Sequence, residues 1–66
     1  MSRSRFSNYN RRIKMLLARD YDWDVDESTK WLQDNRPFVH AMYRSASPTG
    51  YTTKLIAVEL KLERKN

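Results

Sequence analysis

The chain has 66 residues, a net charge of +5 and no cysteine. A chain this short forms one small domain that buries only about 60% of its unfolded surface, so a homodimer or another partner is one way to supplement its core. Without cysteine, disulfides and thiolate metal sites are excluded. One histidine and one glycine are too few for a multi-histidine metal site or a glycine-rich phosphate loop. The longest apolar run, Leu55 to Val58, is too short to cross a bilayer. We therefore expect a cytoplasmic protein without membrane contact, since the lack of cysteine also fits a reducing compartment.

The positive charge is concentrated near the N-terminus. All the basic residues that precede the first acid fall within 19 residues: Arg3, Arg5, Arg11, Arg12, Lys14 and Arg19. Residues 1–6 show no apolar period, which predicts a flexible basic arm ahead of a domain formed by residues 7–66. Such a basic block is typical of a surface that attracts nucleic acid, an anionic membrane or an acidic protein face, and a solvated surface without a partner is the plain alternative.

The segment from Ser7 to Arg19 has the clearest helical pattern in the chain. Its apolar residues recur at the spacing of one helical face: Tyr9, Ile13, Leu16 and Leu17. Phe6 joins the same face if the helix begins earlier. The side chain of Ser7 or Asn8 can cap the helix start. We therefore predict a helix with an apolar core-facing stripe and basic flanks.

The next segment, Asp20 to Asp26, alternates acidic with apolar residues. The spacing is similar to the start of a calcium-binding loop, but Val25 stands where that loop needs glycine and Trp31 where it needs a bidentate glutamate. The segment is better interpreted as an extended connector whose acids face water. Its carboxylates can also pair with Arg12 or Arg19 of the preceding helix.

A second helix is predicted from Val25 to Asn35. Asp24 followed by Glu27 is a capping-box pattern with aspartate in the first position. The helix is expected to end before Arg36-Pro37, because the residue before a proline avoids helical geometry.

After Pro37 the pattern changes to one that favours strands. Residues 38–43 are rich in strand formers, and Ser45 to Gly50 supply the proline and glycine of a loop. From Tyr51 onward the apolar residues alternate with polar ones: Ile56, Val58, Leu60 and Leu62. The predicted fold class is therefore α+β, two short helices followed by a C-terminal β-hairpin. Because Leu, Ala, Glu and Lys favour helices, an all-α fold with a C-terminal helix is the alternative.

The sequence offers no residues for catalysis. His40 is the only imidazole, and an alternating segment places it on a sheet face rather than among catalytic partners. The paired acids of residues 20–27 lie on an element too small to enclose a substrate. We therefore predict no enzyme activity, no catalytic residue, no bound metal and no cofactor.

Nucleic-acid binding is the favoured functional hypothesis. The predicted contacts lie on the first helix and its arm, with Arg44 and Lys54 beside the hairpin loop as secondary contacts: Arg3, Arg5, Arg11, Arg12, Lys14, Arg19, Arg44 and Lys54. The order of elements resembles a truncated winged helix. However, the second helix carries Asp26, Glu27 and Asp34, and an acidic helix reads the major groove poorly. We therefore expect contacts dominated by the phosphate backbone.

A protein-interaction role is the alternative. Large aromatic residues dominate interface hot spots, and this chain has several beyond its first helix: Tyr21, Trp23, Trp31, Tyr43 and Tyr51. In this hypothesis the chain is a phage- or plasmid-type accessory factor that modulates or inhibits a larger protein complex. A homodimer through the sheet edge or the stripe of the first helix fits the same pattern. The competing interpretation is that these aromatics simply form the core.

Overall fold

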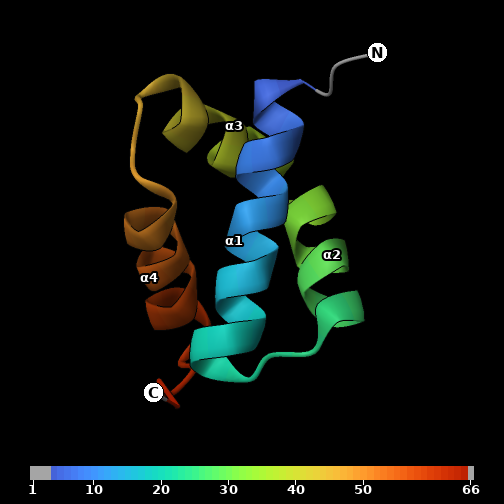
Figure 1. The fold of residues 1–66 in the computed structure, drawn as a ribbon, viewed down its shortest axis with the longest axis vertical. Coiled ribbons are helices and arrows are strands. Elements are labelled where there is room, and N and C mark those ends of the chain that lie inside the picture. The colour runs from blue at the N-terminus through green and yellow to red at the C-terminus, as the bar shows by residue number, and fades with distance from the viewer. Residues whose placement is uncertain (1–3, 66) are drawn as a thin grey trace.

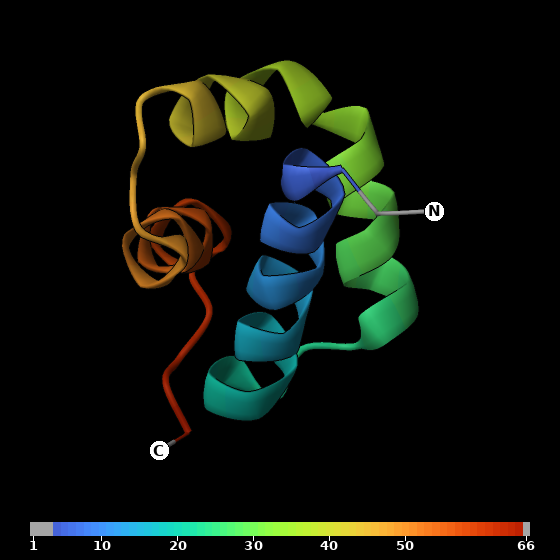
Figure 2. The same cartoon turned by 45° about the horizontal axis from the view of Figure 1, so that its top comes forward.

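The computed structural model describes residues 4–65, and these residues form four α-helices. The helices are α1 (Arg5–Tyr21), α2 (Val25–Asp34), α3 (Arg36–Arg44) and α4 (Thr49–Leu60). α1 lies between α4 on one side and α2 on the other, while α3 crosses one end of the group (Figures 1 and 2). α4 has an extended contact only with α1, whereas α2 also packs against α3. α1 is therefore the central helix of the fold.

The prediction of an α+β fold is wrong. The described residues contain no strand, and both segments assigned to the hairpin are helical, in α3 and α4. α3 begins directly after Asn35, with Pro37 in its first turn. Proline is tolerated there because the first amides of a helix have no intrahelical acceptor. The named alternative, an all-α fold with a C-terminal helix, describes the observed architecture.

α4 is helical because its helical face is the one that packs. Thr52, Thr53, Ile56 and Ala57 recur at helical spacing and are buried against the rest of the fold. The period-two pattern instead included Val58, whose side chain is 67% exposed. The alternation that suggested a strand therefore does not describe the buried surface.

The predicted first helix is confirmed and is longer at both ends. The hydroxyl of Ser4 accepts a hydrogen bond from the Ser7 amide at 3.0 Å, so the predicted caps Ser7 and Asn8 are wrong and lie within the helix. Phe6 is buried with the apolar stripe. Of the predicted basic arm, Arg5 and Phe6 form the first turn of α1, and residues 1–3 lie outside the described residues.

The second helix and its cap are also confirmed. The Asp24 carboxylate accepts a hydrogen bond from the Glu27 amide at 3.0 Å, which satisfies one of the free donors at the start of α2. The predicted connector, Asp20 to Asp26, is shorter than expected, because only residues 22–24 lie between α1 and α2. Asn35 separates α2 from α3, and its side-chain amide donates to the Trp31 carbonyl at 2.9 Å.

Three helices are followed by a left-handed residue that is not glycine. Asp22, Ala46 and Lys61 have φ angles of 53°, 58° and 57° and stand after α1, α3 and α4. After α3, the Ala46 amide donates to Tyr43 and the next amide donates to Met42, the hydrogen-bond pattern of a Schellman motif. These turns fold the short connections back onto the bundle.

The core lies around α1. Among residues 4–65, four apolar side chains are fully buried: Ile13, Leu17, Val39 and Ile56. The Tyr9 hydroxyl lies 2.7 Å from both the Ser47 carbonyl oxygen and the Thr52 hydroxyl. α1 is thereby linked by hydrogen bonds to the α3–α4 loop and to α4. Across residues 4–65, every helix is too short or too polar to span a bilayer.

Candidate functional site

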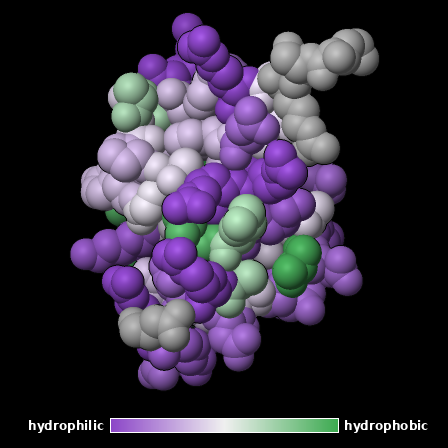
Figure 3. All heavy atoms as spheres, viewed as in Figure 1, coloured by the Kyte–Doolittle hydropathy of each residue, from purple (hydrophilic) through white to green (hydrophobic). Residues whose placement is uncertain are grey.

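The exposed side of α1 carries most of the predicted basic residues. Its apolar stripe faces the core, which leaves Arg5, Arg11, Arg12 and Arg19 exposed and Lys14 partly buried. In Figure 3, hydrophilic side chains cover much of the surface over α1, with a smaller hydrophobic area between them. The sequence-predicted set is therefore mainly a surface of one helix, with Arg3 outside the described residues.

A shallow pocket brings part of this set together with the start of α4. It has a volume of about 270 Å³, and its basic side chains come from α1, α4 and the C-terminal segment: Arg12, Arg19, Lys54 and Arg64. Arg12, Lys54 and Arg64 are exposed and form no ion pair within residues 4–65. We call this the basic pocket.

Arg64 was absent from the sequence-predicted set. It reaches the pocket because the C-terminal segment lies beside the end of α1, where the Lys65 amide donates to the Asp20 carbonyl at 2.6 Å. Lys61, which has a left-handed conformation, ends α4 ahead of this segment. No local pattern in residues 61–65 signals it, because the turn has no glycine.

One acidic side chain reduces the positive charge of the basic pocket. The Asp20 carboxylate lines it and accepts from Arg19, with Nε to Oδ1 at 2.8 Å and Nη2 to Oδ2 at 3.3 Å. Hydrogen bonding to Asp20, together with the charge of that carboxylate, raises the pKa of Arg19 above its ordinary value. Arg19 is therefore charged and oriented, but its charge is shared with Asp20.

The first turn of α4 adds partial positive charge to the same place. Thr49 and Gly50 line the basic pocket. Pro48 precedes them without a side-chain capping hydrogen bond, and no acid lies in the first turn. Amides at a helix start have no intrahelical acceptor and favour an anion. Cationic side chains and a helix start thus converge on one small opening.

The remaining predicted basic residues lie elsewhere. Lys14 borders a separate pocket of about 230 Å³ between α1 and α2, together with Asn10 and Arg36. The Arg36 guanidinium sits 4.8 Å from the centre of the Phe6 ring, a cation–π contact. Arg44 is exposed at the end of α3. The structure thus joins Arg12, Arg19 and Lys54 and separates them from Lys14.

The aromatic residues proposed for a protein interface are mostly part of the packed interior. Four are partly buried against the core cluster: Tyr21, Trp23, Trp31 and Tyr43. Tyr51 differs, because it is exposed on α4. His40 packs edge-on against Phe6, with ring centres 4.8 Å apart. No group of three or more metal-ligating side chains converges anywhere in residues 4–65.

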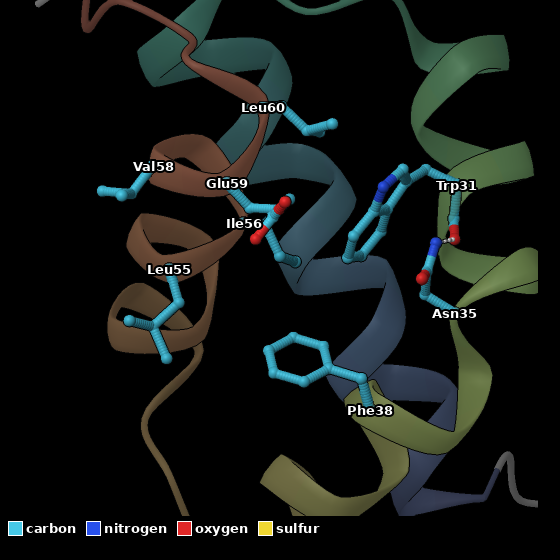
Figure 4. Close-up of a pocket in the computed structure, with 8 residues that line it drawn as sticks. All are labelled: Trp31, Asn35, Phe38, Leu55, Ile56, Val58, Glu59 and Leu60. Carbon is cyan, nitrogen blue, oxygen red and sulfur yellow. Dashed lines mark hydrogen bonds between the residues drawn. The ribbon is translucent and has the colours of Figure 1, made fainter.

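An apolar groove occupies the side of the molecule away from the exposed face of α1. It has a volume of about 720 Å³ and lies between α4 and the α2–α3 pair. Trp31 and Phe38 form one wall, with their rings edge to face at 6.3 Å. The α4 wall has four apolar residues: Leu55, Ile56, Val58 and Leu60. In Figure 4, α1 runs behind these side chains, whereas Figure 1 views α1 from its exposed side. Sequence patterns did not predict this groove, because the α4 wall was assigned to a strand.

Comparisons with protein-family models, curated proteins and solved structures give no match to this chain.

Proposed function

We propose that the chain is a binding protein without catalytic activity that contacts nucleic acid through the phosphate backbone. The observation that carries the proposal is the basic pocket, where Arg12, Lys54 and Arg64 converge from three separate segments beside the start of α4. Guanidinium and ammonium groups neutralise phosphates, and helix starts accept them. A cytoplasmic location, where nucleic acid is accessible, is part of this proposal.

The basic surface is longer than one phosphate. Arg5, Arg12 and Arg19 are spaced by seven residues along one flank of α1. At a rise of about 1.5 Å per residue this flank extends about 21 Å, which matches about six base pairs along a duplex axis. An extended array of charges favours a polyanion over a single small anion.

The acidic residues of α2 argue for backbone contacts rather than base readout. Asp26, Glu27 and Asp34 are exposed on α2, where they would repel phosphates near the major groove. The supporting surface is α1 with the basic pocket, so the proposed binding is largely independent of sequence. Affinity should then come mainly from counterion release.

The test is duplex binding measured by fluorescence anisotropy over a salt series. Affinity should fall steeply between about 50 and about 200 mM salt, as counterion release requires. Arg12→Ala and Lys54→Ala should each weaken binding and lower the slope of log affinity against log salt by about 1. Lys30→Ala is the matched control, because Lys30 is exposed on α2 away from the pocket.

Two results would count against the proposal. A wild-type chain that binds neither duplex DNA nor duplex RNA at low salt does not use this surface for nucleic acid. Equal losses in Lys30→Ala and Arg12→Ala would indicate general charge attraction, with no contribution from the basic pocket.

A further inference from the structure

α4 carries apolar side chains on two opposite sides. Ile56 and Ala57 face the core, while Tyr51 is 54% and Val58 67% exposed on the opposite side. Leu55 lies between these two and is partly buried, and Leu55 and Val58 also border the apolar groove. Figure 4 shows Val58 pointing away from Trp31 and the rest of the bundle. A helix that is apolar all round is normally buried all round. Within residues 4–65, however, α4 packs extensively only against α1.

The outer residues have the spacing of a helix-pairing seam. Tyr51, Leu55 and Val58 are separated by four and then three residues, which is the alternation of the two apolar positions in a coiled-coil heptad. We call them the α4 seam. The seam lies away from α1 and borders the apolar groove through Leu55 and Val58, so a second helix can approach it without displacing α1.

The charged residues beside the seam of one copy are complementary to those of a second copy. Lys54 flanks one edge and Glu59 the other, five residues apart, and both are exposed without an ion pair among the described residues. In a parallel helix pair these two flanking positions face each other across the seam. Lys54 of one copy then meets the partner's Glu59, and the two-fold axis repeats the contact. In an antiparallel pair, like charges would meet instead.

We propose that two copies of this chain associate through a parallel pair of α4 helices. This inference concerns a surface that shares only Lys54 with the proposed nucleic-acid contacts. The seam fits a second copy because one helix supplies both the apolar stripe and the matching charges. The contact is one short helix per copy, about 18 Å long at about 1.5 Å per residue. Such an interface belongs to the small, weak class, so association should be in the micromolar range.

The test is sedimentation equilibrium over a concentration series without nucleic acid, so that its outcome does not depend on the proposed function. The wild type should shift with concentration from the chain mass of 8.0 kDa toward twice that mass. Glu59→Lys and Lys54→Glu should each weaken association by about tenfold, because each replaces two attractive contacts with two repulsive ones. The double variant K54E/E59K should restore it.

A second pair of variants tests the apolar seam. Val58→Asp should abolish the dimer at every concentration reached. Val25→Asp is its matched control, because Val25 is an equally apolar residue, 52% exposed on α2, and it should leave association unchanged. Both positions are exposed, so both variants should keep the helical circular dichroism of the wild type.

Three outcomes would overturn the proposal. A wild type that stays monomeric throughout the series leaves the α4 seam to a different partner. A dimer that Val58→Asp does not disturb uses another surface, such as the exposed side of α1. A dimer that is lost in both single charge variants but not restored in the double variant is not a parallel α4 pair.

Discussion

α1 and α4 pack against each other, but they differ in what they present to solvent. α1 buries one apolar stripe, and its exposed side is polar and basic apart from Met15. α4 buries a similar stripe and exposes a second one at Tyr51 and Val58. The monomer therefore covers all but one of the large apolar side chains of α1, while α4 retains an apolar surface that the monomer leaves open.

The same comparison separates the two proposed surfaces. The basic pocket lies on the edge of α4 that meets α1, where Lys54 stands near Arg12. The α4 seam lies on the side of that helix away from α1 and borders the apolar groove. α4 would thus contribute to both surfaces with different side chains. Variants at Val58 should affect association alone, whereas Lys54 borders both.

The strongest test of the difference between α1 and α4 is to replace one side chain by alanine on each of the two sides of α4. Ile56→Ala should lower the free energy of unfolding by about 3 kcal/mol, because Ile56 is fully buried and its loss leaves a cavity. Val58→Ala should cost less than about 0.5 kcal/mol, as expected for an exposed position. Urea denaturation at low micromolar concentration measures both. A large cost at Val58 under those conditions would mean that the outer side of α4 is already buried in the monomer.

A smaller effect tests how α1 holds α4. Tyr9→Phe removes the hydroxyl that lies 2.7 Å from the Ser47 carbonyl and the Thr52 hydroxyl. Because Thr52 is fully buried, its unpaired hydroxyl should cost about 1–2 kcal/mol of unfolding free energy. Tyr51→Phe is the control, since that tyrosine is exposed on α4.

The Tyr9 prediction has an internal check. In Thr52→Val the buried hydroxyl is absent, so adding Tyr9→Phe should cost less than it does in the wild type. Equal costs in the two backgrounds would show that the Tyr9 and Thr52 hydroxyls do not interact.

The first half of the fold could be predicted from the sequence, because its local signals agree with its packing. α1 has one apolar stripe, and the Asp24 cap marks the start of α2. α4 could not be recognised in this way. Its apolar residues cover two sides, so its helical period is weak, and alternation from Ile56 to Leu62 suggested a strand equally well.

Helix boundaries in the second half were missed because glycine is absent where it would mark a helix end. α3 and α4 are followed by left-handed Ala46 and Lys61 rather than glycine. The only glycine, Gly50, was assigned to a loop but lies in the first turn of α4. Pro37 was interpreted as a break, yet it stands in the first turn of α3. Glycine and proline usually mark loops and breaks, but here they lie in the first turns of two helices.

The candidate site was predictable only in part, because tertiary packing brings several of its residues together. Arg12 and Arg19 follow from the period of α1. Lys54 was selected as the neighbour of a hairpin loop that does not exist, and it lies near Arg12 because α4 packs on α1. Arg64 joins the pocket because the C-terminal segment lies beside the end of α1, which no local pattern indicates. Local sequence patterns do not predict which distant residues tertiary packing brings together.

The smallest predicted effect concerns the start of α4, which lacks the side-chain cap that Ser4 gives α1. A Cβ atom added at Gly50 would meet nothing within 4 Å, and the residue has no positive φ. Gly50→Ala should therefore raise the free energy of unfolding by about 0.5 kcal/mol, mainly by reducing the freedom of the unfolded chain. Urea denaturation with an unchanged slope would report this gain.

The reverse change four residues earlier should also stabilise the chain. Ala46 is left-handed, with a φ of 58°, a conformation that costs an ordinary residue about 1–2 kcal/mol. Ala46→Gly removes that strain and loses part of the gain to the greater freedom of glycine when unfolded, so about 0.5 kcal/mol should remain. The double variant should show both gains added together, because the two changes act on separate backbone positions. Loss of stability in Gly50→Ala would mean that the first turn of α4 needs glycine, so that α4 does not begin where the structure places it.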